Sequence, residues 1–166
     1  MNANRPLFDE ETWQSLPYYF GQLPEPIHLQ IWGDQAATGA EREAVRLAQA
    51  LSVQFETISF TALPRRVDYP YYPVIGIMGS RGDELLDPGV RIIGLPAGYQ
   101  MTSFIAAVQS VSFRGMTSEA KTRIRLRSLN REVVFELLTT ADEEATGVMA
   151  QRIFNMAVVS NHVKAY

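Results

Sequence analysis

The stretch from Gly89 to Val111 constrains the fold of this chain more than any other part of the sequence. It predicts a short buried strand over Val90–Ile93, followed by a tight turn rich in glycine and proline. An amphipathic helix then begins near Thr102 or Ser103, because either side chain can supply its N-cap. A strand that turns straight into a helix carries that helix back across its own sheet, which predicts an α/β protein.

A β-α-β unit precedes this stretch. Ile27–Trp32 alternates apolar and polar side chains as a strand does, and Ala40–Leu51 places its apolar residues at helical spacing. The next strand is expected over Val53–Phe60. This order implies that the two strands are parallel and joined by a right-handed crossover.

The first half also predicts a leading helix and one more strand. Leu7–Leu16 has a helical pattern that Pro17 is expected to end, and Tyr18–Leu23 is expected to form a separate short element. After an irregular stretch over residues 61–73, the apolar run Val74–Met78 predicts a buried strand. A hairpin-like connection joins this strand to the one before the glycine-rich turn.

A new segment begins after Gly115. It predicts a helix over Ser118–Leu129, a strand over Glu132–Thr140, and a loop and long helix over Ala141–Val163. Strand, polar loop and helix also follow one another over Ile27–Leu51, which indicates an internal repeat.

The strand over Glu132–Thr140 would be central in a complete sheet, and we expect the chain to supply no later strand. Its backbone would then lack partners, a state that proteins avoid. The strand could pair with the first sheet, two chains could complete each other, or the protein could be a truncated product. We favour pairing between chains across a hydrophobic two-fold interface, because apolar residues occupy both faces of the strand.

The turn Gly94–Phe104, GLPAGYQMTSF, resembles the turn G-x-P-x-G-H-E-F-T-S of two tandem-thioredoxin families. These are the glutaredoxin-like protein disulfide oxidoreductases and the N-terminal domain of the alkyl hydroperoxide reductase flavoprotein subunit. Tyr99, Gln100 and Met101 stand in the positions of histidine, glutamate and an aromatic residue. Glu119–Val159 resembles the opening of the second thioredoxin unit in the same proteins.

The resemblance implies a complete thioredoxin-like unit with an N-terminal helix over residues 1–115. It implies a linker helix and a partial second thioredoxin-like β-α unit over residues 116–166. It also places Tyr72-Pro73 where these families carry a cis-proline.

A working thioredoxin unit holds a C-x-x-C pair at the N-terminus of the helix after its first strand, where the helix dipole lowers the thiol pKa. The resemblance puts these positions at Ala36 and Gly39 in the first unit, and at Glu143 and Thr146 in the second. The chain contains no cysteine. Both loops are therefore degenerate redox positions, and dithiol chemistry within the chain is excluded.

Other chemistries find little support. The two histidines, His28 and His162, lie far apart in the sequence, so we expect no metal site and no cofactor. Glu143 and Glu144 at a helix start are typical of dipole partners rather than acid/base catalysts. A net charge of −3 argues against nucleic-acid binding, and no run of residues is long and apolar enough for a membrane span.

Two hypotheses follow. The first is a redox-inactive thioredoxin-like module that binds a protein partner or forms a homodimer, without enzymatic activity. The second is a divergent piece of a peroxide-detoxifying disulfide reductase system, whose thiols come from a partner or from missing sequence. The N-terminal sequence has no apolar signal core, so we expect a cytoplasmic protein.

For the first hypothesis, the expected binding surface lies beside the proline that precedes the third strand. Its residues are Trp32, Asp34, Gly39, Tyr72 and Pro73. Aromatic side chains with one polar end suit protein interfaces. The alternative is that these aromatic residues only cover the edge of the domain's own core.

Overall fold

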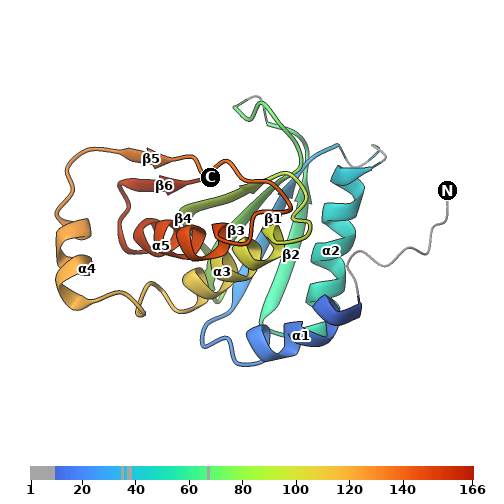
Figure 1. The fold of residues 1–166 in the computed structure, drawn as a ribbon, viewed down its shortest axis with the longest axis horizontal. Coiled ribbons are helices and arrows are strands. Elements are labelled where there is room, and N and C mark those ends of the chain that lie inside the picture. The colour runs from blue at the N-terminus through green and yellow to red at the C-terminus, as the bar shows by residue number, and fades with distance from the viewer. Residues whose placement is uncertain (1–9, 35, 37–38, 67) are drawn as a thin grey trace.

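The structure is a computed structural model that describes residues 10–166 apart from 35, 37, 38 and 67. Figure 1 shows a twisted sheet with helices packed against it. The described elements, in chain order, are α1 (Glu10–Phe20), β1 (Ile27–Trp32), α2 (Ala40–Gln54), β2 (Ile58–Leu63), β3 (Val74–Arg81), β4 (Glu84–Ile93), α3 (Gln100–Ser112), α4 (Ala120–Arg127), β5 (Val133–Phe135), α5 (Thr146–Val159) and β6 (Val163–Ala165). Residues 7–9 of the predicted leading helix lie outside the described residues.

The strands of the first half lie in the order β2-β1-β3-β4. β1 and β2 are parallel, as the β-α-β pattern predicted, and β3 is antiparallel to both β1 and β4. β2 begins later than predicted, because α2 continues to Gln54 and the chain becomes extended only at Phe55. β3 and β4 are longer than predicted and meet in a tight turn at Gly82, where Arg81 pairs with Glu84.

Pro17 lies inside α1 rather than at its end, so the prediction of two separate elements was wrong. Leu16 and Phe20 are both 1% exposed, and they are four residues apart on one face of the helix. Their burial in the core outweighs the loss of the backbone donor that proline lacks.

The helices cover one face of the sheet. Buried side chains of α1, α2, α3 and α5 share a single core with Ile27, Leu29 and Ile31 of β1. The opposite face carries a smaller cluster of Trp32, Val74 and Met78. Within the described residues, this second face is covered by the connection between β2 and β3 rather than by a helix.

The second half extends the sheet of the first. β6 lies between β4 and β5 and is parallel to both, giving the full order β2-β1-β3-β4-β6-β5. The expectation of no later strand was therefore wrong. The helix ends at Val159 rather than near Val163, which frees Val163–Ala165 to form β6, while β5 is shorter than predicted.

This arrangement pairs β5 within the chain on the side that faces β6. Pairing between chains at the other edge of β5 stays a prediction. α5 packs beside α3 over the sheet (Figure 1), which joins the two halves through their helices as well. α4 has no buried residue, so its basic side chains lie on a solvated helix.

Candidate functional site

Glu143 and Thr146, the positions predicted as a degenerate redox pair in the second half, lie at the N-terminus of α5. Glu143 is exposed, whereas Thr146 is only 5% exposed. The backbone N–H of Tyr99 donates to Ala141 O at 2.9 Å, and Gln100 Nε2 donates to Thr139 Oγ1 at 3.2 Å. The glycine-rich turn of the first half is therefore bound to the loop that would hold a redox pair.

Two glycines permit this close approach. A Cβ atom at Gly147 would lie 2.6 Å from Thr102 Oγ1, and one at Gly98 would lie 2.6 Å from the backbone oxygen of Ala141. Gly98 also has a φ of 52°, in the left-handed region that favours glycine. The absence of side chains at these positions explains why the turn and the loop can touch.

The helix after this turn starts earlier than predicted. α3 begins at Gln100 with Tyr99 as its N-cap, so neither Thr102 nor Ser103 is the cap. The Thr102 hydroxyl donates to Tyr99 O at 2.5 Å instead. Ser103 is buried, and its Oγ has no hydrogen-bond partner among the described residues.

Ala36 and Gly39, the positions predicted as a degenerate redox pair in the first half, lie between β1 and α2. Asp34, Ala36 and Gly39 are all exposed, and the N–H of Ala36 donates to Asp34 Oδ1 at 2.9 Å. Glu41 accepts hydrogen bonds from the Asp34 N–H and from the guanidinium of Arg65. The hydrogen bond from Arg65 is the main reason that the pKa of Glu41 is lowered.

The Tyr72–Pro73 peptide bond is cis, as the resemblance implied, and β3 begins at the next residue. The Trp32 ring lies close to Gly76, where an added Cβ would be 2.6 Å from a ring carbon. Tyr69 stands beside Trp32 with ring centroids 5.9 Å apart. Tyr72 meets Tyr69 edge to face and donates its hydroxyl hydrogen to Arg66 O.

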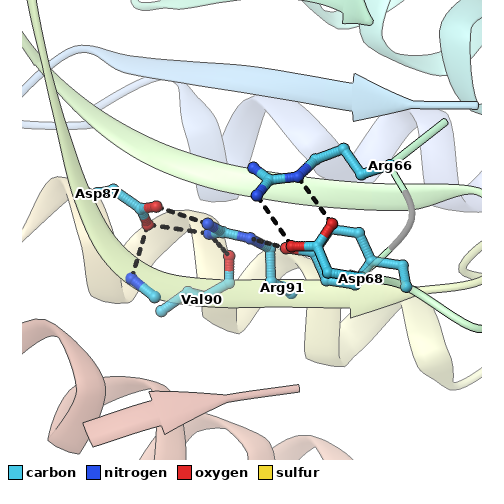
Figure 2. Close-up of polar contacts among 7 residues, drawn as sticks. Arg66, Asp68, Asp87, Val90 and Arg91 are labelled. Carbon is cyan, nitrogen blue, oxygen red and sulfur yellow. Dashed lines mark hydrogen bonds and ion pairs between the residues drawn. The ribbon is translucent and has the colours of Figure 1, made fainter. Parts of the chain in front are cut away.

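Arg91 of β4 is buried beneath this aromatic group. Its guanidinium donates to both carboxylate oxygens of Asp87, at 2.9 and 2.5 Å, and to the Tyr69 hydroxyl at 3.0 Å. Figure 2 shows the Asp87–Arg91 pair, with Arg66 and Asp68 forming a second pair nearby. Arg91 and Arg66 also lie 5.3 and 5.7 Å from the centre of the Trp32 ring.

Arg91 is buried whereas Asp87 is about half exposed, and each stabilises the charged form of the other. Burial alone would raise the pKa of Asp87, but hydrogen bonds and charge from Arg91 outweigh burial and lower it. Burial would likewise lower the pKa of Arg91, and the Asp87 carboxylate raises it. Arg91 is thus charged but neutralised, and it fixes the β2–β3 connection on the sheet.

The five residues expected to form a binding surface are brought to one end of the sheet, but they differ in exposure. Asp34 and Gly39 are exposed and Tyr72 is half-buried, whereas Trp32 and Pro73 are buried. Tyr71 is 72% exposed beside them. Trp32 and Pro73 can therefore support a surface from beneath, while the other residues are accessible.

Metal and membrane sites find no support in the described part of the chain. No group of three or more His, Cys, Asp or Glu side chains there could hold a metal ion. The His28 ring nitrogens lie 2.8 Å from Ser59 Oγ and 3.0 Å from Thr61 Oγ1, and burial lowers the pKa of His28. No helix among these residues has the length and apolar character needed to cross a membrane.

Sequence reasoning missed Arg91 and Asp87, and it considered Ser103 only as a possible N-cap. An arginine inside an apolar strand gives no signal of the carboxylate that will meet it, although Asp87 four residues earlier was visible. The unpaired hydroxyl of Ser103 depends on how α3 is rotated, which the sequence leaves open.

Comparison with solved structures identifies the class of fold as thioredoxin-like. The NTD_N/C domain of alkylhydroperoxide reductase AhpF from Enterococcus faecalis matches with a TM-score of 0.79 and 19% identity, over 95% of this chain and 78% of that chain. The AhpF subunit of the same organism matches at 0.81 and 18%, over 96% and 78%. A protein disulfide oxidoreductase from Aeropyrum pernix matches at 0.72 and 15%, over 97% and 75%.

No protein-family model matches the chain, and no curated protein sequence matches it. The resemblance drawn from the glycine-rich turn is nevertheless confirmed at the level of fold, because it named the same two kinds of protein. At these identities the likeness establishes the fold alone.

Proposed function

We propose that this chain is a redox-inactive thioredoxin-like module that binds a protein partner, a second copy of itself included. The supporting observation is the surface around Pro73, formed by Asp34, Gly39 and Tyr72 with the exposed Tyr71 beside them. Buried Arg91 and Trp32 hold this surface in place from below. The degenerate loops at Ala36 and Thr146 carry no sulfur that could exchange with a disulfide.

Each part of this proposal has its own test. The purified chain should reduce insulin no faster than the dithiothreitol background, and clear turnover would contradict redox inactivity. Partner capture and self-association should weaken in Tyr72→Ala and Trp32→Ala but persist in Tyr18→Ala, whose side chain is exposed on α1. Folded variants that all behave like the wild type would contradict the proposed surface.

A second candidate is a divergent piece of a disulfide reductase system whose thiols come from another chain. The contact between the glycine-rich turn and the loop before α5 favours it, because this loop stays folded where a redox pair would sit. Such a piece should raise peroxide or disulfide reduction when mixed with the remaining subunits of that system. An unchanged rate of peroxide and disulfide reduction in every mixture would contradict this second candidate.

Three further predictions concern the domain boundaries, the location of the protein and nucleic-acid binding. We propose that residues 1–115 form a thioredoxin-like unit with its N-terminal helix. Residues 116–166 then form a linker helix and a partial second unit, which β6 and α5 join to the first in one sheet and one helical layer. Limited proteolysis should then cut first near Gly115. The cytoplasmic location and the absence of nucleic-acid binding also stay predictions from the sequence.

A further inference from the structure

β4 departs from regular pairing with β3 in its first half, and a cavity of about 370 Å³ lies there. The register shifts between Ile77 and Gly79, and residues 87–89 of β4 are left out of the ladder. Such bulges are common beside functional sites. Residues of α3, α4 and α5 complete the wall of the cavity.

Three arginine side chains from different parts of the chain line this cavity. Arg81 ends β3, Arg114 follows α3, and Arg127 ends α4. Arg81 and Arg127 are exposed, so their guanidinium groups are accessible to a molecule in the cavity. Within the described residues, neither of these two arginines forms an ion pair. Their charges are therefore available to a ligand.

Asp87, one of two carboxylates in the lining, is engaged by other groups. Its Oδ1 accepts hydrogen bonds from the Gly89 N–H at 2.7 Å and from Arg91 Nη1 at 2.9 Å. Its Oδ2 accepts a hydrogen bond from Arg91 Nη2 at 2.5 Å. Because Arg91 balances the charge of Asp87, this carboxylate leaves Arg81 and Arg127 without a partner.

Glu25, the other carboxylate in the lining, is held by the end of α3. Arg114 Nη2 donates to Glu25 Oε2 at 2.8 Å. The Ser112 hydroxyl donates to Glu25 O at 2.6 Å and accepts a hydrogen bond from the Glu25 N–H at 3.1 Å. A guanidinium has five N–H donors, so Arg114 keeps donors for a ligand while it is paired. Its pairing with Glu25 fixes it at the cavity before any ligand binds.

The helices explain the positions of these arginines only in part. A positive side chain is favourable at a helix C-terminus, which accounts for Arg114 and Arg127. It does not account for Arg81, which ends a strand. Residues 114–131 also hold six Lys or Arg side chains and a single acidic one, Glu119, although the whole chain has a net charge of −3. The segment that supplies Arg114 and Arg127 therefore attracts anions.

The charge and the size of the cavity indicate the kind of anion. Guanidinium groups bind phosphate through paired hydrogen bonds, and a phosphate monoester carries a charge of about −1.5 to −2 at pH 7. This charge matches that of Arg81 and Arg127 together. A cavity of roughly 150 Å³ accepts benzene, so 370 Å³ has room for a phosphate group and a small organic group attached to it. Leu86, Val111 and Val158 provide apolar contacts for that organic group.

We propose that this cavity binds a phosphate group, free or carried by a small organic molecule, between the guanidinium groups of Arg81 and Arg127, with Arg114 as a third donor. None of the residues that line the cavity belongs to the surface around Pro73, so the site does not depend on the proposed protein partner. A bound phosphate would link the hairpin of β3 and β4 to α4, and so the first half of the chain to the second.

The test compares phenyl phosphate with phenyl sulfate, which has the same ring but one negative charge. The ionic strength is held constant at about pH 8, where the phosphate ester is a dianion. Calorimetry should show saturable binding of phenyl phosphate, about tenfold tighter than that of phenyl sulfate, because the second charge strengthens the hydrogen bonds from arginine. Inorganic phosphate distinguishes the two sources: an affinity at least equal to that of phenyl phosphate identifies free phosphate as the ligand, and a weaker one identifies a phosphate ester.

The variants test which arginines hold the phosphate group. Arg127→Gln should weaken binding of phenyl phosphate about tenfold, as expected for the loss of a hydrogen bond between charged groups. Arg125→Gln is the matched control, because Arg125 is an exposed arginine in the same turn of α4 that does not line the cavity. It should change the affinity by less than about twofold. Arg81→Gln repeats the test from β3 and keeps it valid if Arg127→Gln unfolds α4.

The backbone amide signals of Gly79 and Asn161, which line the cavity, should shift in NMR spectra when phenyl phosphate binds. Absence of saturable binding of phenyl phosphate would overturn the proposal. Equal affinities for phenyl phosphate and phenyl sulfate would overturn it as well. Equal losses in Arg127→Gln and Arg125→Gln would also overturn it, because the net charge of α4 rather than the cavity would then account for binding.

Discussion

The loop after β1 and the loop before α5 each lead from a strand into a helix, but different contacts hold them. The first loop exposes Asp34, Ala36 and Gly39, and Glu41 and Arg65 tie it by charge. The second loop packs against the glycine-rich turn, and its Thr146 is buried. The first loop is therefore accessible from solvent, whereas the second forms a contact between the two halves.

The largest expected effect tests the packed loop. Gly98→Ala should lower the free energy of unfolding by about 2–4 kcal/mol, because it adds steric overlap to left-handed backbone strain. Gly82→Ala is the matched control, since Gly82 has a φ of 58° but an added Cβ would meet nothing within 4 Å. It should cost about 1 kcal/mol. Equal losses of unfolding free energy in the two variants, measured by urea denaturation, would show that the turn and the loop are not in close steric contact.

A smaller effect tests accessibility in both loops. Single cysteines introduced by Ala36→Cys, Glu143→Cys and Thr146→Cys all lie near a helix N-terminus, so burial should dominate their differences in reactivity. We expect the thiol at position 146 to react with Ellman's reagent at least about tenfold more slowly than the other two, because it needs local opening. Comparable reaction rates of the thiols at all three positions would contradict the conclusion that one loop is open and the other packed.

The smallest effect tests the charge contact at the first loop. The pKa of Glu41 is lowered in the folded chain, so its stabilisation is present above the ordinary value of 4.5 and is lost as the pH falls through the folded value. Glu41→Gln should therefore reduce stability at pH 7 by up to about 1 kcal/mol and weaken its decline in acid. Glu43→Gln, which breaks an exposed pair with Arg46, is the control. A larger loss from the control would contradict the role of Glu41.

The sequence predicted those elements whose pattern is local. β1 alternates with period two, and Ile27, Leu29 and Ile31 are buried while His28 and Gln30 are half-exposed. The strand, turn and helix from β4 to α3 also follow from short-range rules. The cis bond before Pro73 came from the family resemblance rather than from any local pattern.

Elements that depend on distant contacts were missed. β6 contains only Val163, Lys164 and Ala165, so it is too short to show a periodic pattern. It forms because β4 and β5 pair with its backbone. Pro17 was expected to end α1, but packing of Leu16 and Phe20 overrides that local preference. The hydrogen bond from Gln100 to Thr139 joins residues 39 positions apart, which no local pattern can indicate.

The most direct test of the binding module uses a photoreactive residue at an exposed tyrosine. Replacing Tyr71 with p-benzoylphenylalanine should give a discrete cross-linked adduct in the native cells, and adding Tyr72→Ala should remove it. The same replacement at Tyr18 is the control, because Tyr18 is 84% exposed and Tyr71 is 72% exposed. An identical set of adducts at both positions, or none at position 71, would contradict a partner surface around Pro73.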